Sequence, residues 1–258
     1  MRYLLCCTRQ ELSVVTYPET FFDQQENGSW NSARIVLQEL WHIVQPISVV
    51  DIGCGLGQWL KASSDLGASR ILGVDGDYIR RDRLWIDEAS FRSCDLETQS
   101  CRVVIPEDCS FDLTISLEVA EHLSERRAAP FIDDVCSLGD LVLFSAAIPG
   151  QAGSNHFNTQ WPTYWNALFR NHDFYCFDNL RPKVWDNTAV EWWYAQNVLV
   201  FARFGTASYA AIHRVAAPTS KPMSLVHPRM HAAVSSWYED RLREFEQDIN
   251  RFQSATTR

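Results

Sequence analysis

Several features that define common protein classes are missing from this 258-residue sequence. It has eight cysteines but no C-x-x-C pair or other zinc-like spacing, so a structural zinc site is not expected. No apolar run approaches the roughly 18 residues that cross a membrane, and the run in the first ten residues is too short for a signal peptide. We therefore expect no membrane insertion, reduced cysteines and a cytoplasmic protein.

Positive charge is also scarce. Lysine and arginine number 23 against 32 acidic residues, which gives a net charge of -9. Such a chain repels the phosphates of nucleic acid, so nucleic acid is disfavoured as a partner. Hydrophobic residues make up 46% of the chain, and this length is sufficient for one domain with a large core.

Short apolar runs alternate with helical patterns over residues 31–204. Strands are expected at 47–53, 70–77, 90–97, 111–119, 140–150, 174–178 and 197–204. Helices are expected at 31–44, 57–66, 124–138 and 162–171. This alternation predicts an α/β fold, with a Rossmann-like, doubly wound, mostly parallel seven-stranded sheet and helices on both faces. Ligands of such sheets bind outside the carboxyl ends of the strands.

Three further segments flank this domain. Residues 1–30 are expected to be irregular, with 26–34 as a lid over the cofactor by analogy alone. Residues 205–228 are rich in Ala, Ser, Thr and Pro and are typical of a linker. Residues 229–258 predict a C-terminal amphipathic helix that packs on the domain or forms a homodimer. Its apolar face is Val234, Trp237, Leu242, Phe245 and Ile249.

The stretch VVDIGCGLGQWL, residues 49–60, predicts a strand that enters a tight turn and then a helix. Glycines let such a turn approach a ligand closely, here Gly53, Gly55 and Gly57. The dinucleotide pattern G-x-G-x-x-G is absent, because Gln58 replaces its third glycine. Asp51 adds a carboxylate suited to a cationic ligand, and S-adenosylmethionine (SAM) carries a sulfonium and an ammonium group.

This stretch resembles motif I of the class I SAM-dependent methyltransferases. GVDGD, CDLE and FDLTISLEVAEHL follow in the order of that family, and the resemblance covers roughly residues 30–204. It implies that Asp75 binds the ribose hydroxyls and that Asp95 approaches the adenine amino group. In all, it implies cofactor contacts from Asp51, Gly53, Cys54, Gly55, Gly57, Asp75, Gly76, Asp95, Leu96 and Leu117.

The second half resembles a narrower bacterial group of methyltransferases, often associated with glycan or secondary-metabolite pathways. The similar segments are LEVAEHL, LFSAAIPGQ, QWPTYW, LRPKVW and WWYAQN. Thr159 replaces an acid that this group often shows, so any role of that acid does not carry over. The resemblance implies a small-molecule or saccharide acceptor. The tryptophans either stack on that acceptor or form core.

A hydroxyl acceptor needs a base or a metal, because a free alcohol is hardly ionised at pH 7. Glu118, Glu121 and His122 share one side if their turn begins a helix, since they stand at i, i+3 and i+4. With His156 from a later loop, they would hold Mg²⁺ or Mn²⁺. E-x-x-E-H plus a later His is similar to the metal site of small-RNA 2′-O-methyltransferases, and E-x-x-E-H recurs in ubiquinone-pathway O-methyltransferases.

Other interpretations of these residues stay open. His156 is also a candidate metal-free general base. In a further interpretation, the acid of the Glu121–His122 pair contacts the cofactor and His122 only packs. We expect Glu118 and His156 to be catalytic, in metal-assisted O-methylation of a sugar, glycan or secondary metabolite. The alternatives are an RNA-terminal 2′-O-methyltransferase and a non-catalytic SAM-binding partner subunit.

Overall fold

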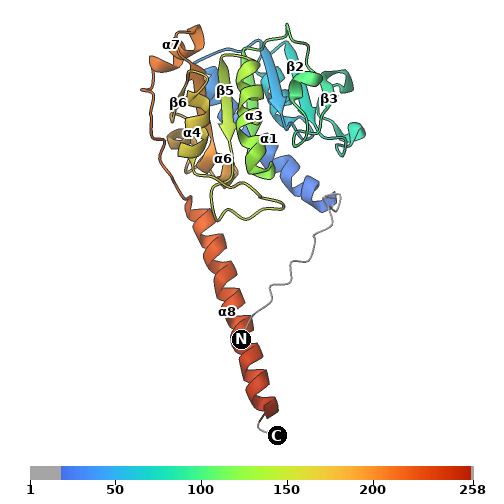
Figure 1. Ribbon diagram of the computed structural model, residues 1–258, viewed down its shortest axis with the longest axis vertical. Coiled ribbons are helices and arrows are strands. Elements are labelled where there is room, and N and C mark those ends of the chain that lie inside the picture. Colours follow the sequence, from blue (N-terminus) through green and yellow to red (C-terminus); the bar gives the residue numbers. More distant parts are fainter. Residues whose placement is uncertain (1–18, 257–258) are drawn as a thin grey trace.

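The computed structural model describes residues 19–256, and a seven-stranded sheet forms its centre, in the order β3-β2-β1-β4-β5-β7-β6 (Figure 1). β7 is antiparallel to β5 and β6, and the other neighbouring strands are parallel. The predicted fold is therefore confirmed. The strands are Ser48–Ile52 (β1), Arg70–Asp75 (β2), Phe91–Ser93 (β3), Leu113–Leu117 (β4), Leu141–Ser145 (β5), Phe174–Phe177 (β6) and Leu199–Arg203 (β7).

Helices cover both faces of the sheet, because successive residues of a strand point to opposite sides. Val49 packs in one apolar cluster with α1 and α2, and Val50 packs in a second cluster with α3 and α4. Burial on both faces explains why the strands are unbroken apolar runs. The helices are Glu19–Trp41 (α1), Gln58–Asp65 (α2), Glu125–Ser137 (α3), Pro162–Arg170 (α4), Arg181–Val184 (α5), Trp192–Asn197 (α6), Ala207–His213 (α7) and Pro228–Thr256 (α8).

Two segments that were expected to be irregular contain helices. α1 begins at Glu19, so residues 19–30 are helical, whereas residues 1–18 of the expected irregular segment lie outside the described residues. Gly28 fits this helix where Glu191 approaches it, since a Cβ there would stand 2.4 Å from the Glu191 Oε1. α7 lies within the expected linker, and the Thr206 side chain caps its first turn.

The predicted C-terminal helix is present as α8, and it projects away from the domain (Figure 1). Its first turn is anchored: Met230 is buried, and Arg229 lies 3.7 Å from the Glu191 carboxylate. None of the helices within residues 19–256 combines the length and apolarity needed to cross a bilayer. Six cysteines in this range carry free thiols: Cys54, Cys94, Cys101, Cys109, Cys136 and Cys176.

Candidate active site

The glycine turn after β1 lies at the carboxyl edge of the sheet and requires glycine for two reasons. All three glycines have φ between 54° and 88°, which side chains rarely tolerate: Gly53, Gly55 and Gly57. A Cβ on Gly53 would also stand 2.2 Å from a methyl carbon of Val119. The turn is therefore closed against the segment after β4, so the predicted cofactor and metal residues are neighbours.

Asp75 ends β2 with its carboxylate against the glycine turn. It accepts hydrogen bonds from the N–H of Gly55 (2.7 Å), the N–H of Gly76 (2.7 Å) and the hydroxyl of Tyr78 (2.6 Å). Burial raises the pKa of Asp75, and these three donors oppose the rise. Both oxygens have a partner, and a carboxylate of this kind suits hydroxyl ligands.

The remaining predicted cofactor residues lie around the same edge. Asp51 is buried in β1, and its burial together with the nearby charge of Asp75 raises its pKa well above the usual range. Asp95 is exposed after β3, where it accepts a hydrogen bond from the Thr98 hydroxyl at 2.7 Å. All lie at the edge where parallel sheets bind ligands. Cys54, Leu96 and Leu117 are buried there.

The candidate metal-binding turn follows β4 directly. Glu118 has φ of 56°, a strained value for a non-glycine residue and typical of functional sites. Ala120–His122 then form a 3-10 turn, not the start of an α-helix. The expectation that Glu118, Glu121 and His122 share one helical face is therefore wrong, because the backbone changes direction at Glu118.

The loop after β5 is bound to this turn through the backbone. The carbonyl of Glu121 accepts N–H groups from Phe157 at 2.9 Å and Asn158 at 3.0 Å. The rings of His122 and His156 consequently lie edge to face, with centroids 4.9 Å apart. One potential ligand atom from each of Glu121, His122 and His156 lies within 4.8 Å of the others. The structure thus brings together three of the four predicted metal ligands.

The carboxylate of Glu121 is fully buried, and neither oxygen has a hydrogen-bond partner in the part of the chain that the structure describes. Burial raises its pKa well above the usual range, and the charge of Glu118 raises it further. A buried carboxylate without a partner is costly. A bound cation would remove this cost, so the residues present fit a divalent metal.

Both imidazoles are in a form that can bind a metal. The Nδ1–H of His122 donates to the carbonyl of Asn155 at 3.3 Å, and the Nδ1–H of His156 donates to the carbonyl of Gln151 at 3.1 Å. This tautomer leaves a lone pair on Nε2, as in histidines that ligate metals. Burial lowers the pKa of His122 to about 4 and also lowers that of His156. Both rings are neutral at pH 7, which a general base would require as well.

Glu118 lies beside this group, and side-chain amides hold its carboxylate. Asn197 Nδ2 donates to Oε1 at 3.0 Å, and Gln151 Nε2 donates to Oε2 at 2.8 Å. Gln196 in turn donates to Gln151 Oε1 at 3.0 Å. Gln151 joins the two parts of the site, because its side chain binds Glu118 and its carbonyl binds His156. These amides were not among the predicted site residues; their signal is the polar pair Gln196–Asn197, which only Val198 separates from the apolar strand β7.

The aromatic residues near His156 divide into surface and core. Phe157 is 71% exposed and Trp161 is 37% exposed, so both are available to an acceptor. Trp165 is buried in the apolar cluster against Phe144, at a centroid distance of 5.5 Å. One tryptophan of QWPTYW is therefore core, and the other faces solvent.

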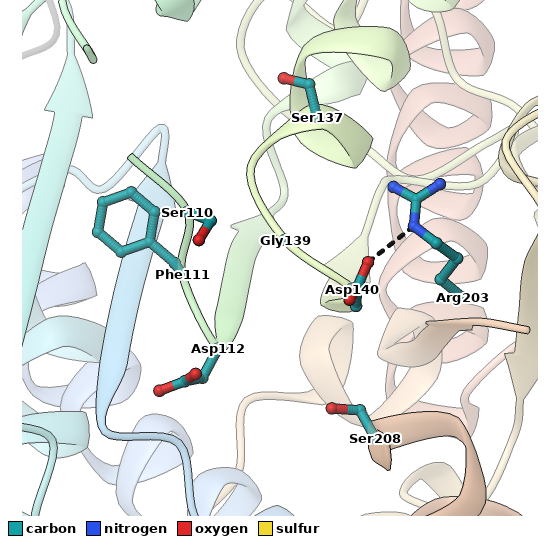
Figure 2. Close-up of a pocket in the computed structure, with 8 residues that line it drawn as sticks. All are labelled: Ser110, Phe111, Asp112, Ser137, Gly139, Asp140, Arg203 and Ser208. Atoms are coloured by element: carbon teal, nitrogen blue, oxygen red, sulfur yellow. Dashed lines mark hydrogen bonds and ion pairs between the residues drawn. The ribbon is translucent and has the colours of Figure 1, made fainter. Parts of the chain in front are cut away.

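A cavity of about 300 Å³ lies at the opposite, amino edge of the sheet (Figure 2). Asp112 and Asp140, which directly precede β4 and β5, line it together with Arg203 at the end of the antiparallel β7. Arg203 is already paired with Asp140 at 2.7 Å. This cavity is thus separate from the candidate active site, whose residues come from the carboxyl ends.

Comparison with known proteins finds similarity to methyltransferases. Residues 50–131 match a family described as a methyltransferase domain. A ribosomal protein L11 methyltransferase from Shewanella sediminis (strain HAW-EB3) is 33% identical over 116 residues, which cover 44% of this chain and 38% of that protein. A second, from Shewanella halifaxensis (strain HAW-EB4), is 31% identical over the same length. The matched segment spans well under half of these curated relatives.

Solved methyltransferases share the fold. An O-methyltransferase family protein from Burkholderia thailandensis matches with a TM-score of 0.53 and 14% identity, over 73% of this chain and 60% of that one. A SAM-bound amino pentose methyltransferase from Micromonospora echinaspora matches with a TM-score of 0.53 and 11% identity, over 74% of this chain and 99% of that one. At these identities the structures establish the fold alone. Together with the family match, they support a SAM-dependent methyltransferase.

Proposed function

We propose that this chain transfers a methyl group from SAM to a hydroxyl of a small polar acceptor, a sugar, glycan or secondary metabolite, with a divalent cation held by Glu121, His122 and His156. The observation that carries the proposal is the unpartnered buried carboxylate of Glu121 beside two neutral imidazoles. This group lies next to the glycine turn, because Val119 packs against Gly53. The carboxylate suits Mg²⁺ or Mn²⁺, and the two imidazoles favour Mn²⁺ over Mg²⁺, because Mg²⁺ prefers oxygen ligands.

The residues of the chain would divide the work as follows. The carboxyl ends of β1 and β2, with Asp51 and Asp75, would hold SAM. When bound, the cation would supply Lewis acidity that makes an acceptor hydroxyl easier to ionise. Glu118, fixed by Asn197 and Gln151, would orient the acceptor or complete the ligand set. In-line alignment of the acceptor with the methyl group is the main requirement, because the sulfonium is already activated.

The acceptor class rests on the surface beside His156. Phe157 and Trp161 present exposed rings there, and aromatic faces pack well on sugar rings. The net charge of -9 argues against RNA as the acceptor. The L11 methyltransferase match covers only 38% of that protein, so its acceptor does not extend to this chain. Metal-dependent RNA 2′-O-methylation and a non-catalytic partner role remain alternatives, and the cytoplasmic location remains a prediction.

The test is transfer of labelled methyl from SAM into a fractionated extract of the source cell, with and without EDTA. We expect label in a saccharide or small-molecule fraction, lost with EDTA and with Glu121→Gln. Label that survives EDTA but not His156→Ala would overturn the metal and assign His156 as the base. Label in an RNA fraction would favour the RNA alternative. SAM binding without label in any fraction would favour the partner subunit.

A further inference from the structure

The distal part of α8 carries an apolar stripe that the domain does not cover. Its large side chains are each about half exposed or more, and α8 extends away from the domain (Figure 1). They are Tyr238, Leu242, Phe245 and Ile249, and Tyr238 takes the place expected for Trp237, which is exposed one position away from the stripe. A single projecting helix is marginal in water, because most helical stability in proteins comes from packing an apolar face. We therefore expect another surface to pack against this stripe.

The spacing of the stripe is that of a coiled coil. The intervals from Tyr238 to Leu242, Phe245 and Ile249 are four, three and four residues, which place them at d, a, d and a of a heptad. Val234, four residues before Tyr238, is at g in this register and flanks the seam on the side toward the domain. A 29-residue helix is about 43 Å long, so this seam lies well beyond the anchored first turn.

We propose that α8 pairs with α8 of a second copy of this chain as a parallel two-stranded coiled coil. The charges beside the seam favour one partner and one direction over the others. In the assigned register Arg241 is at g and Glu246 is at e, and a g residue faces the e residue five positions later on a parallel partner. A parallel homodimer therefore forms two Arg241–Glu246 pairs and places no like charges opposite each other at these positions.

An antiparallel pair is less favourable. When Tyr238 faces Ile249 and Leu242 faces Phe245, Arg241 meets Asp248, but Glu239 meets Glu246. Each attraction is then matched by a repulsion. A lipid surface fits less well too, because α8 contains five acidic residues and four arginines, whereas anionic membranes select basic helices.

Parallel pairing also agrees with the anchoring of α8. Met230 and Arg229 hold the first turn on the domain, so the two domains would lie at the same end of the paired helices. The exposed ion pairs within α8, such as Arg241 with Glu244, do not compete strongly, because surface pairs of this kind contribute little.

The first test is the mass of the full chain in solution, by sedimentation equilibrium at micromolar concentration. We expect twice the 29.6 kDa of one chain. Leu242→Glu should weaken dimerisation about a hundredfold, because the dimer would bury two unpaired carboxylates. Gln247→Glu is the matched control: it adds the same charge at f, on the outer side, and should leave the dimer intact. A monomer at every concentration, or equal effects of the two variants, would overturn the proposal.

The second test determines whether the two α8 helices are parallel or antiparallel. Mixed Tyr238→Cys and Ile249→Cys chains are oxidised, and the linked peptides are identified by mass spectrometry, with the parent chain as control. A parallel seam gives 238–238 and 249–249 links. A predominance of 238–249 links would contradict the parallel arrangement. Neither substitution should destabilise the folded monomer, because Tyr238 and Ile249 are each about half exposed or more.

Discussion

Asp75 and Glu121 are buried carboxylates at the same edge of one sheet, but their surroundings differ. Asp75 accepts three hydrogen bonds from the protein, two from backbone amides and one from a tyrosine. Glu121 accepts none at its carboxylate within residues 19–256, and the charge of Glu118 raises its pKa. The carboxylate of Asp75 has its hydrogen-bond partners without a ligand, whereas the carboxylate of Glu121 does not. The predicted cofactor half is therefore preformed, whereas in the proposed function the other half requires a bound cation.

The largest expected effect follows from removing the charge of Glu121. Glu121→Gln keeps the shape, so methyl transfer should fall about a thousandfold while SAM affinity changes little. The ligand-free protein should gain about 1 kcal/mol of stability at pH 7, because folding no longer has to bury a carboxyl group whose pKa is raised well above its usual range. Turnover and chemical denaturation measure the two effects. Glu107→Gln, at an exposed position, should alter neither, and a less stable, fully active Glu121→Gln would contradict the account.

The next effect is on the pH dependence of stability. Burial lowers the pKa of His122 from 6.5 to about 4, so the folded state favours its neutral form. The stability linked to this shift is present above pH 6.5 and is lost as pH falls toward 4. Between pH 6.5 and pH 4, the parent chain should lose roughly 3 kcal/mol more of its free energy of unfolding than His122→Gln does. Urea unfolding of ligand-free protein at the two pH values measures this difference. If the free energy of unfolding falls equally with pH in the parent and the variant, His122 does not titrate in this way.

Gly53→Ala tests the preformed half. The added Cβ meets Val119, and the left-handed φ is strained as well, so SAM affinity should fall about a hundredfold by calorimetry. Gly67→Ala is the matched control, since Gly67 also has positive φ but nothing lies within 4 Å of its Cβ position. It should cost about 1–2 kcal/mol of stability and leave SAM affinity unchanged. Equal SAM affinities for the two variants would show that the glycine turn does not contact the cofactor.

The smallest effect concerns the acceptor. Phe157→Ala should raise the KM for the acceptor about tenfold, because a stacking ring is lost, with no change in the KM for SAM. Stability should also stay constant, since Phe157 is 71% exposed. Phe204→Ala, at a similarly exposed ring beyond the other end of β7, serves as the control. An unchanged acceptor KM would place the acceptor elsewhere.

The cofactor half was predictable because its signals are local. The glycine turn, Asp75 at the end of β2 and every strand of the sheet follow from residues close together in the sequence. His156 was also placed correctly beside Glu121 and His122, since loops after neighbouring parallel strands meet at one edge.

The amide network was not predictable in the same way. Asn197 reaches Glu118 across 79 residues, because β7 inserts between β5 and β6. Arg181 shows the same limit, because it is buried and donates a hydrogen bond to the carbonyl of Gln196, 15 residues further along the chain. In both cases the partner is set by tertiary packing, which local patterns do not contain.

The most direct measurement is binding of Mn²⁺ to the full chain, followed by electron paramagnetic resonance. We expect one bound ion per chain, which is lost in Glu121→Gln and retained in Asp75→Asn, whereas Asp75→Asn should weaken SAM binding. Absence of Mn²⁺ binding in the parent chain, or binding that Glu121→Gln leaves unchanged, would contradict the claim that Glu121, His122 and His156 hold a cation.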